Sequence, residues 1–245
     1  MKNYFKEIII TIVLTTIIGV TGIAIHNNQM HDLFDKTTST QFDIKKDSLE
    51  DILNNAKEIK VQKQIFSWSK QYYVSVDDVV VAKIDGKIFN LTGDKLIVRD
   101  RQGNIVKTEY QIKRFGPTHK SLFNISLDRL GEIQDASGKV TGFIGEKKLK
   151  DFFSLVHKQY FFSPDGKTLA QGTQRFWSKD FTITDNNDKT IYTIDGNLFS
   201  PSSKATIRKI ADNDIDMLDV ILYNIIEDSI MNGRSSSSSS SKKSK

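Results

Sequence analysis

The sequence of 245 residues contains no cysteine, only three prolines and only four histidines. Without cysteine, the chain has no disulfide framework, thiol nucleophile, iron–sulfur cluster or cysteine-ligated zinc site. Three prolines and 14 glycines exclude collagen-like and proline-rich classes. The net charge of +5 is only mildly basic, and this balance does not indicate a nucleic-acid partner.

The motifs of common catalytic sites are missing as well. No Gly-x-Ser-x-Gly, Walker loop, dinucleotide fingerprint or His-Glu-x-x-His occurs in the sequence. None of the four histidines stands at ligand spacing from carboxylates on one element. The aspartates near predicted turns have a structural explanation, because their side chains bond to the turn backbone. The sequence therefore predicts a protein that is not an enzyme and that uses no metal or cofactor.

One long apolar run lies near the amino terminus, at residues 8–25. These 18 residues carry no charge, and as a helix rising about 1.5 Å per residue they reach roughly 27 Å, close to the thickness of a bilayer's hydrocarbon core. Lys2 and Lys6 precede the run, whereas Asp32 and Asp35 follow it. The positive-inside rule then places the N-terminus in the cytoplasm and the remainder outside. We expect a single-pass membrane anchor over residues 1–25, with a cleaved signal peptide as the alternative.

Polar segments flank the body of the chain. Residues 26–58 form a polar linker, in which Ser48 followed three residues later by Asp51 predicts the start of a short helix. Residues 232–245 include seven consecutive serines followed by Lys-Lys-Ser-Lys. Such a segment has no apolar surface to bury, which predicts a disordered tail.

The body, residues 59–231, contains an internal repeat centred on phenylalanine. Within each of two sets of three copies, the phenylalanines recur at spacings of 23 or 26 residues. The copies are Ile65-Phe66-Ser67, Ile88-Phe89-Asn90, Arg114-Phe115-Gly116, Phe152-Phe153-Ser154, Phe176-Trp177-Ser178 and Leu198-Phe199-Ser200. Each unit contains strand and turn signals. Apolar and polar residues alternate with a period of two, as from Val106 to Ile112, and turn residues such as Pro164-Asp165-Gly166 follow. Two strands of about eight residues with their turns occupy about 23 residues, so six copies predict six hairpins, or about twelve antiparallel strands.

A sheet of twelve strands is expected to close, because closure removes its exposed edges. A barrel of this width is too wide to be filled by its own side chains, since about eight strands already suffice for a filled interior. The segment 214–231 reads as a helix that is apolar on nearly all faces, and its longest apolar run is four residues, too short to span a membrane. We therefore expect a mainly β protein, a closed, roughly twelve-stranded antiparallel barrel around a central C-terminal helix. The helix residues expected in the core are Leu218, Ile221, Leu222, Ile225 and Ile226.

This order of motifs resembles the tubby C-terminal-like superfamily, in particular the LURP-one-related proteins and the phospholipid scramblases. The Phe-Ser hairpins carry the resemblance over about residues 61–230, together with Ile84-Asp-Gly-Lys-Ile-Phe, Ile194-Asp-Gly-Asn-Leu-Phe and the aspartate-rich start of the apolar helix. The resemblance implies a closed twelve-stranded barrel around a central helix, and it supplies no catalytic residue. Tubby proteins bind phosphoinositides and scramblases move lipids. Because the anchor expected here is N-terminal rather than C-terminal, scrambling is not implied.

Two basic clusters are candidate contacts for anionic lipid headgroups. They comprise Lys113 and Arg114, and Lys147, Lys148 and Lys150. Each such charge near an anionic surface contributes about 1 kcal/mol to binding. A solvated barrel exterior is the other interpretation of the same residues. We expect a membrane-anchored, non-enzymatic module that binds anionic lipid or envelope components, and the alternative is a structural or protein-interaction module at the cell envelope with no lipid ligand.

Overall fold

The computed structural model describes residues 47–64, 70–86, 95–112, 127–147, 156–175, 180–196 and 204–226. In these ranges a short helix, α2 (Leu49–Asn55), precedes twelve strands and a helix over residues 217–226, here called the central helix. The strands are β1 (Glu58–Lys63), β2 (Lys70–Val76), β3 (Val79–Gly86), β4 (Lys95–Asp100), β5 (Ile105–Ile112), β6 (Leu127–Asp135), β7 (Val140–Lys147), β8 (Val156–Phe162), β9 (Thr168–Arg175), β10 (Phe181–Asp185), β11 (Thr190–Asp195) and β12 (Lys204–Lys209). The anchor, the first part of the linker and the tail predicted from the sequence lie outside the described residues. Within those residues, no helix has the length and apolar character that crossing a bilayer requires.

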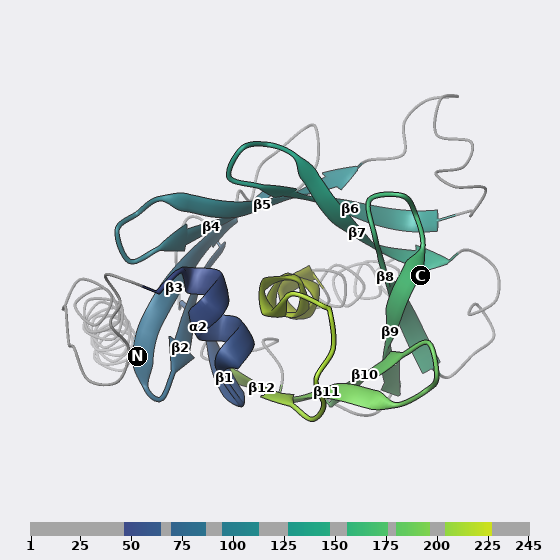
Figure 1. Cartoon of the computed structure of the whole chain (residues 1–245). Helices are drawn as coiled ribbons and strands as arrows, with labels where there is room; N and C mark the ends of the chain where they lie inside the picture. Colours follow the sequence, from purple (N-terminus) through teal and green to yellow (C-terminus); the bar gives the residue numbers. More distant parts are fainter. Residues whose placement is uncertain are drawn as a thin grey trace, which may run out of the picture.

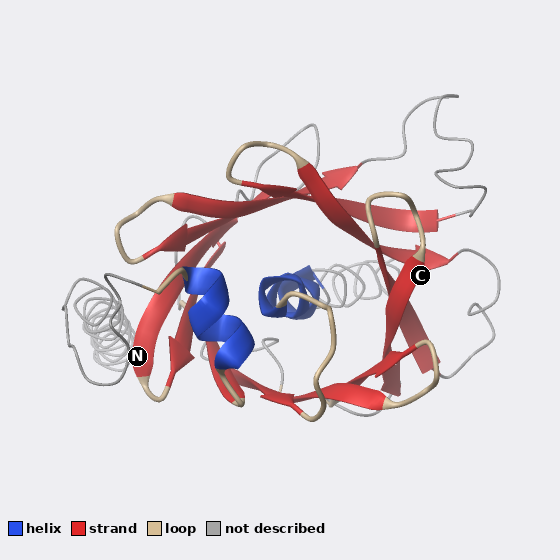
Figure 2. Ribbon diagram, in the orientation of Figure 1, coloured by secondary structure: helices blue, strands red, loops and turns tan. Residues whose placement is uncertain are grey.

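The strands form a closed antiparallel barrel. Each strand pairs with its neighbours in sequence, and β1 pairs with β12 to complete the ring (Figure 1). This arrangement confirms the twelve-stranded closed barrel and the C-terminal helix that the repeat and the apolar segment predict. The helix α2 crosses one end of the barrel, which we call the α2 end (Figure 2).

Tight turns join each even-numbered strand to the next strand at the α2 end. Four of them share one pattern, in which the fourth turn residue has a positive φ and the register shifts beside the turn. Gly103, Gly138 and Gly166 hold φ angles of +83° to +85°, and Asp188 takes the same role at +61°. These are three-residue hairpins with a bulge, in which glycine supplies the left-handed backbone at low cost.

The six phenylalanines of the repeat lie elsewhere. All of them fall in segments that join an odd-numbered strand to the next one, and these positions are outside the described residues. The repeat therefore predicts the number of strands, although its six central phenylalanines lie in the ranges between the described strands.

The central helix lies inside the barrel (Figure 2). Leu218, Ile221, Leu222 and Ile225 have no exposed surface and belong to one large core cluster with side chains from the surrounding strands, and Ile226 packs partly buried against it. The helix begins at residue 217 rather than at the expected 214, and residues 227–231 lie outside the described ranges.

The inner wall of the barrel has two different halves. In β1–β4 and β10–β12 the inward residues are apolar, such as Ile59, Val74 and Ile194. In β5–β9 the inner face is mixed, because apolar core residues such as Ile133, Ile144 and Phe161 alternate there with small and polar ones. These small and polar residues are Lys107, Glu109, Gly131, Gln159 and Gly172. At Gly172 a Cβ atom would overlap the phenol of Tyr223. The absence of a side chain at this position therefore allows the Tyr223 ring of the central helix to pack directly on the β9 backbone.

Candidate functional site at the α2 end

A buried lysine joins the barrel wall to the start of the central helix. The Lys107 Nζ atom lies 2.6 Å from Asp216 Oδ2 and 2.7 Å from Asp219 Oδ1. The Lys107 side chain is only 4% exposed. Asp216 and Asp219 are three residues apart, so they lie on the same side of the helical turn and reach one ammonium group together. The Lys107 ammonium group therefore balances only one of the two negative charges of Asp216 and Asp219, whose carboxylates are largely shielded from water.

Side chains from two segments cap the first turn of the central helix. The Asn54 Oδ1 atom in α2 accepts a hydrogen bond of 2.8 Å from the Met217 amide, and Asp216 Oδ1 accepts one of 2.9 Å from the Leu218 amide. The first amides of a helix have no partner within the helix, so these bonds satisfy groups that would otherwise be orphaned. The α2 helix begins in the same way, because the Ser48 hydroxyl accepts from the Asp51 amide as the capping pattern predicts.

Carboxylates outnumber cations around this junction. Burial raises the pKa of Glu50, and repulsion from Asp216 raises it further, while Lys107 offsets part of the shift. Burial likewise raises the pKa of Asp219 to about 6, against the attraction of Lys107. The pKa of Lys107 is raised, because the attraction of Asp219 and Asp216 outweighs the opposing effect of its burial. The lysine is therefore a permanent cation, whereas Glu50 and Asp219 bind protons more readily than usual.

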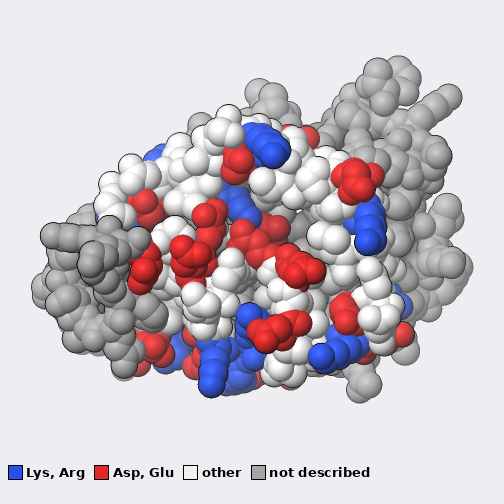
Figure 3. All heavy atoms as spheres, in the orientation of Figure 1, with Lys and Arg blue, Asp and Glu red and all other residues white. Residues whose placement is uncertain are grey.

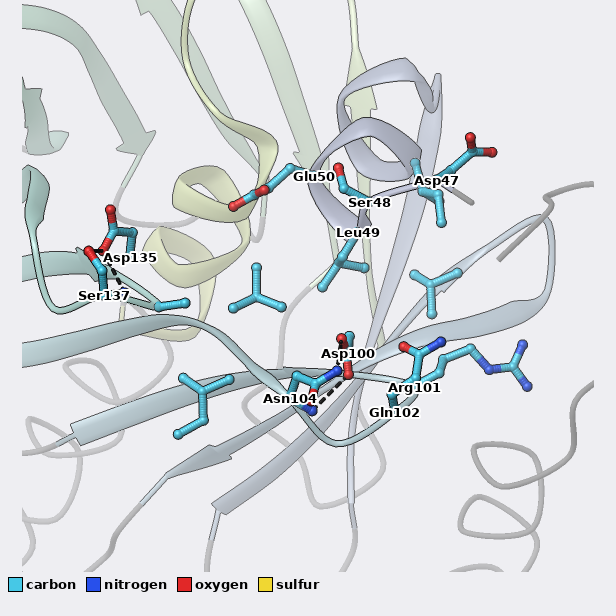
Figure 4. A pocket seen from close by; sticks show the side chains of 15 residues that line it. Asp47, Ser48, Leu49, Glu50, Asp100, Arg101, Gln102, Asn104, Asp135 and Ser137 are labelled. Carbon is cyan, nitrogen blue, oxygen red and sulfur yellow. Dashed lines mark hydrogen bonds between the residues drawn. The ribbon is translucent and has the colours of Figure 1, made fainter. Parts of the chain in front are cut away.

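A cavity of about 580 Å³ opens beside this network. It lies between the start of α2, the turn from β4 to β5 and the turn from β6 to β7 (Figure 4). Leu49, Ile52, Val81, Val106 and Ile105 supply apolar surface to the cavity. Its polar lining includes the carboxylates Asp47, Glu50, Asp100 and Asp135. In Figure 4 the Glu50 side chain points from α2 toward the central helix, and the Arg101 side chain extends away from Glu50 and Asp135.

Two of these four carboxylates also hold the backbone of their own turns. Asp100 accepts from the amide and the side chain of Asn104 at 2.8 and 2.9 Å. Asp135 accepts from the Ser137 hydroxyl at 2.6 Å and from the Ser137 and Lys139 amides, and the bond from the hydroxyl lowers the pKa of this exposed carboxyl most. These aspartates are structural in the turn while presenting negative charge to the cavity.

The surface at the α2 end carries an excess of acidic side chains near its centre. Figure 3 views the molecule along the barrel from this end, and Asp and Glu side chains gather over the middle of the face, with Lys and Arg mostly around its rim. Within the described residues, no group of three or more His, Cys, Asp or Glu side chains has an arrangement that could hold a metal ion. The acids are thus spread over a surface rather than converging on one point.

Among the basic residues predicted to bind anions, only Lys147 falls within the described ranges. Lys113, Arg114, Lys148 and Lys150 lie outside the described residues. Lys147 is the last residue of β7, a strand that starts at the α2 end and runs to the opposite rim, and its side chain is not among those described. The predicted anion site therefore stays a prediction.

Lys107 is the site residue that sequence reasoning misses. The alternation from Val106 to Ile112 favours an inward Val106, Thr108 and Tyr110. Val106 does pack against the core, but the register shifts beside it, and from there Lys107 and Glu109 face the interior, at 3% and 2% exposure. Nothing within β5 announces this reversal. The signal lies in the central helix, where two acids at a spacing of three residues sit on an otherwise apolar, buried segment and require a cation opposite them.

Comparison of the chain with family models, with curated proteins and with solved structures finds no match in any of the three.

Proposed function

We propose that this chain is a membrane-anchored, non-enzymatic binding module of tubby-like fold. The anchor is the apolar segment 8–25, the N-terminus is cytoplasmic, and the barrel is outside the cell. Support for the fold family comes from the closed antiparallel barrel of twelve strands with a C-terminal helix in its interior, which is the arrangement that the resemblance implies.

The observation that carries the proposal is the filled interior. Leu218, Leu222 and Tyr223 of the central helix have no exposed surface, and the strand side chains around them close into one core. The described part of the barrel, packed in this way, offers other molecules its surface, its rims and the cavity at the α2 end. We therefore expect this barrel to act by binding other molecules at its surface or in its end cavity.

For the ligand we propose anionic lipid or another anionic envelope component at the rim opposite α2. Lys147 ends β7 at that rim, and Lys113 and Arg114 directly follow β5, which runs the same way. The acidic face at the α2 end repels anions, so the two ends of the barrel favour ligands of different charge.

Vesicle capture tests this proposal on the full chain. The protein is reconstituted in phosphatidylcholine nanodiscs and mixed with vesicles of phosphatidylcholine containing one fifth phosphatidylglycerol, and co-flotation is measured. We expect capture that weakens with salt and is absent with pure phosphatidylcholine vesicles. Replacing Lys147, Lys148 and Lys150 by glutamine removes roughly 3 kcal/mol, or about 100-fold in affinity.

A matched variant controls for general loss of charge. Lys139, Lys167 and Lys189 stand in hairpin turns at the α2 end, and their replacement by glutamine removes the same charge from the other rim. Equal loss in the two triple variants, or equal capture of both vesicle types by the unchanged protein, would rule out the lipid version.

A second candidate function is a protein-interaction module without a lipid ligand. The observation that favours it is the acidic face with a cavity at the α2 end. Cross-linking in intact cells tests it, because an interaction module yields the same protein partner in independent experiments and a lipid binder does not.

A further inference from the structure

The cavity at the α2 end combines an apolar lining with an excess of carboxylates. We propose that it binds a peptide segment of a partner protein through a lysine or arginine side chain that is flanked by an apolar residue. The proposal rests on the second candidate function, the protein-interaction module, and names the chemistry that the partner must present.

The dimensions and the walls fit such a segment. About 580 Å³ lies within the range of specific ligand sites and accommodates a long cationic side chain together with a neighbouring aliphatic one. Leu49 and Ile52 of α2 face Val81 and Val106 of the barrel wall around the cavity. At the rim, Ile105 is 41% exposed and is one of only three large hydrophobic residues in the described ranges with more than a third of their surface exposed.

The charges around the cavity require a cation. Asp47 and Glu50 come from the start of α2, and Asp100 and Asp135 from the ends of two strands. Arg101 also lines the cavity, but its side chain extends away from Glu50 and Asp135 (Figure 4). The nearest buried cation, Lys107, is held by Asp216 and Asp219 at 2.6 and 2.7 Å. The field at Glu50 is therefore dominated by other acids. A ligand ammonium or guanidinium group relieves this repulsion.

The spread of the acids favours an organic cation over a metal ion. A metal ion needs several oxygen atoms converging within about 2.6 Å of one point. Asp100 and Asp135 are held in separate turns by their own hydrogen bonds, and no metal-binding group of three acids exists among the described residues. A flexible side chain that carries several donors satisfies carboxylates on different walls.

Peptide binding to the full chain in neutral detergent micelles tests the proposal. The probe is a fluorescein-labelled pentapeptide that alternates leucine and lysine. Its controls replace lysine by glutamate in one case and leucine by serine in the other. Fluorescence anisotropy, with empty micelles subtracted, should show saturable and salt-sensitive binding of the leucine–lysine peptide, weaker binding of the serine–lysine peptide and none of the glutamate peptide.

Variants place the binding in the cavity. Asp47→Asn with Glu50→Gln removes the two cavity carboxylates that do not hold hairpin turns, and we expect binding weaker by about three- to tenfold. Ile105→Ser removes the exposed apolar rim and should weaken the leucine–lysine peptide but not the serine–lysine peptide. Asp77→Asn is the matched control, because Asp77 is an exposed acid in the β2–β3 turn that does not line the cavity, and asparagine tolerates its positive φ.

Several outcomes would overturn the proposal. These are no saturable binding of the leucine–lysine peptide, equal binding of the glutamate peptide, or equal losses in the Asp77 variant and in the double variant. Binding of Ca²⁺ alone, abolished by Glu50→Gln, would make the cavity a metal site instead. If cross-linking in cells captures the same partner with and without the Asp47 and Glu50 substitutions, the interaction function stands and the cavity proposal falls.

Discussion

Lys107 holds together three parts of the chain that are distant in sequence. It belongs to β5, its acceptors are Asp219 of the central helix and Asp216 directly before that helix, and Glu50 approaches from α2. Removing the lysine would leave two acids largely buried without a counter-ion, which costs more than the pair itself contributes. The net charge of the network is negative, so its stability depends on the protonation of the acids.

Asp219 makes this dependence measurable. Its ordinary pKa is 3.8 and burial raises the value to about 6 in the folded protein. A raised pKa in the folded state adds stability that is complete below the unfolded value and is lost as the pH rises through the folded value. Between pH 4 and pH 7.5 the unchanged protein should therefore lose up to about 3 kcal/mol of unfolding free energy through this group, and Asp219→Asn should not.

Urea unfolding followed by circular dichroism at pH 4, 5, 6 and 7.5 measures the effect. The difference in unfolding free energy between Asp219→Asn and the unchanged protein should be near zero at pH 4 and should grow in favour of the variant above pH 6. The control is Asp212→Asn, a fully exposed carboxylate in the segment before the helix. Parallel curves for Asp219→Asn and the unchanged protein would contradict the burial argument.

Single residues differ in how far the sequence predicts them. Leu218 and Leu222 can be placed in the core because a helix that is apolar on all faces has to be buried. Gly172 cannot be identified in this way, since its role depends on the position of the Tyr223 ring from another element. The same holds for Glu50, whose setting is created by acids more than 80 residues away.

At the scale of elements, α2 and the central helix form one unit at the barrel end. Leu49, Ile52 and Leu53 of α2 are buried in the same core cluster as the central helix, and the Asn54 side chain caps that helix. The Lys209 Nζ atom also donates to the Asn54 carbonyl at 3.2 Å. A seven-residue helix has little stability of its own, so these contacts hold it in place.

Asn54→Ala tests the link between the two helices. Loss of the cap should cost about 1 kcal/mol of unfolding free energy, and the Met217 amide should exchange with solvent faster. Asn55→Ala is the matched control, because Asn55 is the next residue of the same helix and is exposed. Thermal unfolding and hydrogen–deuterium exchange measure the two effects. Unchanged protection at Met217 in the Asn54 variant would show that the bond does not hold the first turn.

The elements also show where sequence patterns succeed. The repeat predicts twelve strands because each strand pair needs about the same length of chain, and turn residues such as Gly103 and Gly138 mark the hairpins locally. The pattern does not predict which face of β5 turns inward. That choice follows from the two acids of the central helix, a contact between residues more than 100 positions apart.

At the scale of the whole molecule, the chain path places the start of both described helices at the acidic end of the barrel. The linker enters at Asp47, beside the acidic cavity, and the central helix runs from that end into the barrel. Residues 26–46 can extend to about 70 Å, so if segment 8–25 is a membrane anchor, the barrel is free to turn either end toward the membrane. An anionic bilayer repels the acidic end, which favours a barrel that meets lipid with the opposite rim.

The location of the barrel relative to the membrane is tested on intact cells. If segment 8–25 is a membrane anchor with a cytoplasmic N-terminus, external trypsin should cut the linker at Lys36, Lys45 or Lys46 and release the barrel. A cleaved signal peptide would instead give a chain that is separable from the membrane before any protease is added. A barrel on the cytoplasmic side would be cut only after the cells are opened. A cytoplasmic marker protein that stays intact in the same sample shows that the cells are closed. Because the three arrangements give three different patterns of release, one experiment decides whether the acidic cavity faces the envelope or the cytoplasm.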